Sequence, residues 1–217
     1  MTLRIAYGRA NEGDAGPEQS LTTGTKLRLS DRPYPFAEPP DLVRAVTVED
    51  RLALLHEHLR SLSGPWDRLA ALFLDCYFEW IASAIDAADA ELRAMAASVG
   101  GLFQPSDWSF SALRPLPQAH LPAGDGARAR ADFAFWTGNS FIALDLQGSA
   151  APRKQRREEL SRLAAAGTAL IAVPGVVLQQ ERANLLARVL PSDMLRFWAD
   201  VRLPAGPFGP DALDDFA

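Results

Sequence analysis

The stretch that decides the fold runs from Arg128 to Gly148 and reads RARADFAFWTGNSFIALDLQG. Apolar and aromatic residues alternate on both sides of Gly138-Asn139, a dipeptide suited to the positive φ angles of a two-residue hairpin loop. The stretch therefore predicts two antiparallel strands, and the tight turn between them fixes their register. The predicted facing pairs are Trp136/Phe141, Phe135/Ile142, Ala134/Ala143, Phe133/Leu144 and Asp132/Asp145.

Side chains alternate across a strand, so these pairs sort into two faces. One face is a continuous apolar stripe that must lie against a core, made of Phe135/Ile142, Phe133/Leu144 and Ala131/Leu146. The other face is mixed, and it carries Trp136/Phe141, Ala134/Ala143, Asp132/Asp145 and Arg130/Gln147.

The register places two carboxylates, Asp132 and Asp145, directly opposite each other, with side-chain roots roughly 5 Å apart. Like charges at that distance destabilise a sheet unless a cation lies between them, one carboxyl is protonated, or both reach open water. The flanking alanines and aromatics argue against a fully solvated face. A divalent metal held by oxygen ligands is the interpretation that uses both acids.

Composition indicates a globular protein of one domain, or of one domain with an appendage, since the chain has 217 residues, 48% of them hydrophobic and 23% charged. The single cysteine, Cys76, excludes an intramolecular disulfide and is expected to be buried. We find no run of about 18 apolar residues and no secretion signal, so neither a membrane partner nor export is expected, and the cytoplasm is the default location.

The net charge of −5 does not favour general nucleic-acid binding, yet the basic residues are unevenly placed. A basic rim beside an acid pair is what a metal-dependent phosphodiester site needs. The alternative is that the helix after the hairpin simply presents a solvated basic face. The residues of this rim are Arg128, Arg130, Arg153, Lys154, Arg156 and Arg157.

The chain divides into three parts. Residues 1–46 form an irregular or β-like strap with a proline-rich linker, and within it Leu3 to Tyr7 and Lys26 to Ser30 alternate as short strands do. Residues 47–200 form a single α/β domain. Residues 201–217 are a Pro/Gly-rich acidic tail.

Within the central domain, Thr47 caps a first helix and a long apolar helix runs from about Trp66 to Ser98. Asp75 and Glu79 lie at i and i+4 on one side of the long helix, where they either pair with a base or face a site, unless that side is solvated. Further elements are expected at 108–113 (strand), 152–166 (helix), 168–173 (strand), 176–190 (helix) and a short helix from Ser192. This order predicts an α/β fold with a mixed sheet flanked by helices.

That order, with an acid in the second strand and acid-x-polar at the end of the third, resembles the PD-(D/E)xK nuclease superfamily, which has the restriction-endonuclease-like fold. Residues 66–175 cover its common core, with an α-helical N-terminal extension before it. Within the superfamily, the chain most resembles small bacterial relatives of very-short-patch-repair endonucleases. The segments that carry this resemblance are FIALDLQG from Phe141 to Gly148, the basic helix 153–162, the strand 169–173 and Phe197-Trp198.

The resemblance implies a metal site for Mg²⁺ or Mn²⁺. In it Asp132 is the first metal-binding acid, Asp145 the second, and Glu79 on the long helix is the acid that the first helix of the family's core often contributes. Gln147 takes the position of the catalytic lysine, and Lys154 on the following helix is the candidate to supply the missing charge. The five arginines of the basic rim would contact the nucleic acid, with DNA preferred over RNA as the expected partner.

The implied function is metal-dependent hydrolysis of phosphodiester bonds, in defence or repair. The competing interpretation is a catalytically inactive nuclease-like module that serves as an interaction or structural subunit and docks onto a protein partner or a second copy. Gln147 favours the second interpretation, because an amide orients water but cannot compensate charge as lysine does. No nucleotide-binding glycine loop, zinc-type Cys/His cluster or nucleophile triad supports another enzyme class.

Overall fold

The computed structural model describes residues 2–8, 18–31, 47–64, 67–148, 153–201 and 203–204. Its centre is a six-stranded mixed sheet in the order β2-β1-β3-β4-β5-β6, in which only β5 and β6 run parallel. The predicted mixed α/β architecture is therefore confirmed. The strands are β1 Thr2–Ala6, β2 Glu18–Thr22, β3 Leu116–Pro122, β4 Arg128–Trp136, β5 Phe141–Gln147 and β6 Ala169–Pro174.

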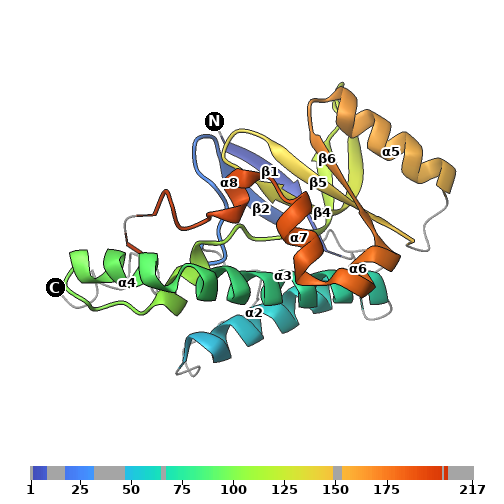
Figure 1. Cartoon of the computed structure of the whole chain (residues 1–217). Helices are drawn as coiled ribbons and strands as arrows, with labels where there is room; N and C mark the ends of the chain where they lie inside the picture. Colours follow the sequence, from blue (N-terminus) through green and yellow to red (C-terminus); the bar gives the residue numbers. More distant parts are fainter. Residues whose placement is uncertain are drawn as a thin grey trace.

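Helices lie on both sides of the sheet. Figure 1 shows α2 and α3 packed together along one side, and α5 on the other side, where it packs on β4 and β6. No helix in the described ranges is both long and apolar enough to cross a membrane. The helices are α2 Val48–Ser63, α3 Arg68–Ala87, α4 Asp89–Ser98, the 3-10 helix η1 Pro105–Ser111, α5 Arg153–Ala165, α6 Gly175–Glu181, α7 Ala183–Val189 and α8 Ser192–Leu195.

The central hairpin has the predicted register. The β4–β5 ladder runs from Trp136↔Phe141 to Phe133↔Leu144. The turn closes where the Thr137 N–H donates to the Ser140 carbonyl at 3.1 Å, and Gly138 adopts a φ of +99° that favours glycine.

The apolar face of the hairpin packs on α3 through aromatic rings. Phe73 meets Phe133 with ring centroids 4.5 Å apart, and Tyr77 meets Phe135 at 5.4 Å. Burial raises the pKa of Tyr77, whose hydroxyl donates to the Leu113 carbonyl at 2.7 Å. Ala131 was expected on this face but belongs to a second cluster, with Ala134, Ala143 and Leu163 of α5.

The N-terminal strands join the same sheet, because Ala6 of β1 pairs with His120 of β3. The second strand is Glu18–Thr22, so the strand predicted at Lys26 to Ser30 is wrong. There the main chain bonds to two separate segments, since Leu27 N–H donates to Trp136 and Leu29 N–H to Ala112, and no continuous ladder forms. The proline-rich stretch 32–46 and residues 205–217 lie outside the described residues.

Three further predictions are corrected. Residues 108–113 do not form a strand, because Pro105 and a capping box between Gln104 and Asp107 start the 3-10 helix η1, and the strand follows at Leu116. The long helix is divided at Ala88 into α3 and α4. The helix expected at 176–190 is divided at Arg182, whose φ of 48° is not helical. The order of elements around the hairpin is unchanged.

Candidate functional site: an acid pair bridged by an arginine

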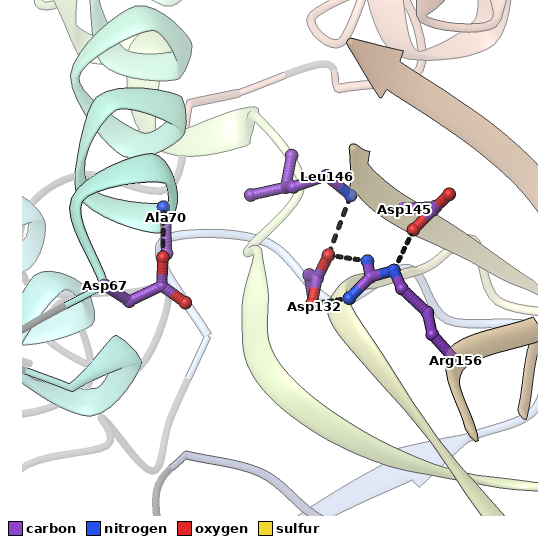
Figure 2. Close-up of polar contacts among 6 residues, drawn as sticks. All are labelled: Asp67, Ala70, Asp132, Asp145, Leu146 and Arg156. Atoms are coloured by element: carbon purple, nitrogen blue, oxygen red, sulfur yellow. Dashed lines mark hydrogen bonds and ion pairs between the residues drawn. The ribbon is translucent and has the colours of Figure 1, made fainter. Parts of the chain in front are cut away.

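The candidate site lies one position beyond the β4–β5 ladder, where Asp132 of β4 and Asp145 of β5 converge. Helix α5 brings Arg156 over the same point, and Figure 2 shows its guanidinium between the two carboxylates. The side chains of Asp132, Asp145 and Arg156 are only 5%, 13% and 15% exposed. The three groups therefore form a largely buried cluster.

The guanidinium of Arg156 bonds to both acids. Its Nη1 lies 2.9 Å from Asp132 Oδ1, its Nη2 donates to Asp132 Oδ2, and its Nε donates to Asp145 Oδ1. A bidentate arginine–carboxylate pair is among the stronger charge-assisted contacts in proteins. The sequence left three ways for the facing acids to be tolerated: a cation between them, a protonated carboxyl, or exposure to water. In the structure a cation lies between them, and that cation is the side chain of Arg156.

Asp132 also accepts a main-chain bond. The Leu146 N–H donates to Asp132 Oδ2 at 2.7 Å. Leu146 lies beyond the last β4–β5 pair, so the carboxylate supplies the acceptor that β4 would otherwise provide for this amide. Burial acts to lower the pKa of Arg156, but the hydrogen bonds and charges of Asp132 and Asp145 outweigh it, and its pKa is raised. Both acids therefore favour the charged form of the guanidinium.

As placed, the acid pair does not fit a resident Mg²⁺ or Mn²⁺. These ions need several converging oxygen ligands in near-octahedral geometry. Within the described ranges no three His, Cys, Asp or Glu side chains gather as a metal site, and both carboxylates of the pair are bonded to Arg156. A metal would have to replace the guanidinium.

Glu79, the further metal-binding acid that the resemblance implied, is bound elsewhere. Its side chain on α3 is 46% exposed and accepts from Arg182, with Nε 2.9 Å from Oε2. Asp75 pairs with His56 Nε2 at 2.9 Å and with Arg60 at 3.6 Å. Asp75 and Glu79 are thus each paired with basic side chains.

Asp67, at the start of α3, also appears in the close-up of the site. It accepts the Ala70 N–H at 2.9 Å and caps its own helix (Figure 2). In the described part of the chain, no contact links this carboxylate to the acid pair.

Gln147 and Lys154 do not supply the cation of this site. Gln147 is exposed at the end of β5 beside Pro174, and Lys154 is exposed in the first turn of α5. Arg156 supplies it, although the sequence suggested only a nucleic-acid contact for this residue. The helical spacing points to Arg156. It lies seven residues before Leu163 and therefore on the same helix face, and Leu163 is fully buried against the sheet.

Two further arginines of the basic rim face solvent. Arg128 and Arg157 are exposed and Arg130 is half-buried, while the side chain of Arg153 lies outside the described part of the structure. His120 faces Arg130 across β3 and β4, and burial together with Arg130 and Arg128 lowers its pKa, against an opposing effect of Glu159. Arg130 therefore lies opposite His120 and two residues along β4 from Asp132.

Comparison with known proteins adds no relative, since no family model, curated protein or solved structure matches the chain. The fold and the site define a mixed α/β protein whose central hairpin carries two acids bridged by an arginine.

Proposed function

We propose that the chain is a nuclease-like module that acts as an interaction or structural subunit and does not cleave nucleic acid. The observation that carries the proposal is the Arg156 guanidinium bonded to both Asp132 and Asp145. In this interpretation the arginine takes the place of a catalytic metal and makes the acid pair part of the fold.

Energetics supports this proposal. A metal could bind only by separating a largely buried ion pair, and leaving one charge of such a pair without its partner costs about 3–5 kcal/mol. Gln147, in the position of the expected lysine, offers no charge to stabilise a transition state. A divalent ion would therefore have to displace Arg156, and no lysine would stand at position 147 to assist catalysis.

A metal-dependent nuclease is the second candidate, and one observation favours it. The two carboxylates come from adjacent strands, and Arg128 and Arg130, which make no ion pair within the described ranges, continue the same strand as Asp132. Oxygen donors of this type suit Mg²⁺, and basic side chains suit a phosphate backbone. This candidate requires Arg156 to leave the pair when metal and nucleic acid bind.

A cleavage assay separates the two candidates. The wild-type protein and Asp145→Ala are incubated with Mg²⁺ or Mn²⁺ and end-labelled single- and double-stranded DNA and RNA. The non-catalytic proposal predicts no cleavage above the Asp145→Ala background. Metal-dependent cleavage that disappears in Asp145→Ala would overturn it and establish the nuclease.

A further inference from the structure

Strand β6 forms one edge of the sheet in the described part of the chain, with β5 as its neighbour on the other side. Its residues Ala169 to Pro174 carry no charge, and no Asp, Glu, Lys or Arg occurs anywhere between Arg162 and Glu181. Figure 1 shows β6 descending from the loop after α5 to the start of α6. The edge is thus apolar along its whole length.

Much of this edge is open. Leu170 is 38% exposed, Val176 just after the strand is 68% exposed, and Ala169 and Ala172 are exposed as well. The opposite edge of the same sheet provides a contrast, because β2 reads EQSLT and includes Glu18 and polar residues. One edge is protected by polar side chains and the other is not.

An open edge strand presents unpaired main-chain N–H and C=O groups, and soluble proteins protect such edges with charges, proline, bulges or a covering element. In β6 the only such device is Pro174, at its very end. An uncharged, β-branched edge is suited to pairing with another uncharged strand, since neither repulsion nor desolvation of charge opposes it.

We propose that β6 pairs with β6 of a second copy of this chain, antiparallel about a two-fold axis perpendicular to the sheet. Two identical edges can meet at such an axis only where they carry no like charges, and β6 satisfies this condition. If the pair is centred on Ile171, Leu170 of each copy lies opposite the small Ala172 of the other copy. Both residues are on the more exposed face of the strand. The two sheets become continuous, and this inference is independent of the proposed function.

The test is the mass of the full chain by light scattering or sedimentation equilibrium over a wide range of concentrations. The wild type is expected at twice 23.6 kDa. Leu170→Lys places a charge from each copy near the axis and is expected to give the monomer. The matched control is Leu102→Lys, which changes a leucine 83% exposed outside the sheet and should leave the dimer intact.

A far-UV circular dichroism spectrum confirms that each variant is folded, and Ala172→Lys replaces Leu170→Lys if the latter does not fold. Hydrogen exchange adds a local readout, because the outward β6 amides should be protected in the wild type and exposed in the monomeric variant. A wild type that remains monomeric at every concentration overturns the proposal and leaves the edge to a strand of another protein. A dimer that persists with lysine at position 170 and at position 172 also overturns it.

Discussion

The guanidinium of Arg156 bonds to both carboxylate oxygens of Asp132, with Nη1 2.9 Å from Oδ1, and so joins helix α5 to strand β4. The two residues are 24 positions apart in the chain. Asp145 accepts from the Nε of the same group, so one arginine bridges both acids of the hairpin. The acid pair is consequently a contact between sheet and helix.

Arg156→Ala should destabilise the protein by about 3–5 kcal/mol, because it leaves two largely buried carboxylates without their cation. For a chain of this size that corresponds to a fall in Tm of roughly 6–20 °C, measurable by differential scanning calorimetry. The matched control is Arg157→Ala, one residue along α5 at an exposed position, which should change stability by less than about 0.5 kcal/mol. Equal effects of the two variants would contradict a structural role for Arg156.

Asp132→Asn should cost more than Asp145→Asn. Both oxygens of Asp132 accept from Arg156 and one also accepts the Leu146 N–H, so an amide NH₂ would meet a donor in either orientation. In Asp145→Asn, by contrast, the new side-chain amide can turn its oxygen toward Arg156. We expect about 3 kcal/mol for Asp132→Asn and about 1–2 kcal/mol for Asp145→Asn in urea unfolding. The reverse order would mean that Asp145 is the main anchor of the arginine.

Gly138→Ala should destabilise the hairpin more than a glycine substitution at an open turn. Gly138 has φ +99°, and an added Cβ would lie 3.3 Å from main-chain atoms of Gly24 and Thr25. Gly126 has φ +74° with nothing within 4 Å, so Gly126→Ala carries the backbone strain alone. We expect roughly 1 kcal/mol for Gly126→Ala and more than that for Gly138→Ala in chemical denaturation. Indistinguishable losses would show that the contact with Gly24 does not matter.

His120 should titrate below its ordinary pKa of 6.5, because burial, Arg130 and Arg128 oppose its charged form more than Glu159 favours it. The unfolded chain then binds more protons than the folded one as the pH falls through 6.5, so the contribution of His120 to stability is lost on acidification in that window. The chain has three histidines, and their ring protons can be followed separately by NMR. Arg130→Gln should move the His120 midpoint upward, whereas an unchanged midpoint would exclude this electrostatic coupling.

The hairpin was predictable from sequence because strict alternation around Gly138-Asn139 determines a single register, and the four facing pairs follow from it. The parallel strand β6 was predictable because a short uncharged run follows a helix, and a strand that follows a helical crossover runs parallel to the strand before the helix. The 3-10 helix η1 was not, because its aromatic residues resemble a strand and its start depends on a cap formed by Gln104 and Asp107. The division at Ala88 has no glycine or proline to mark it.

The candidate site was predictable in part. The convergence of Asp132 and Asp145, and their need for a cation, follow from hairpin register and like-charge repulsion. The identity of the cation does not follow, because α5 carries several basic residues near its start and only the rotation of the helix on the sheet selects one. Arg156 is selected because it shares a helix face with the buried Leu163.

Titration of the wild-type protein with Mn²⁺ by isothermal calorimetry tests whether Arg156 is the cation of the acid pair. We expect the wild type and Asp145→Asn to give the same titration, without saturable binding at the acid pair, because both carboxylates are already bonded to the arginine. Saturable Mn²⁺ binding by the wild type that is lost in Asp145→Asn would contradict the account, since a metal would then replace Arg156 at the pair.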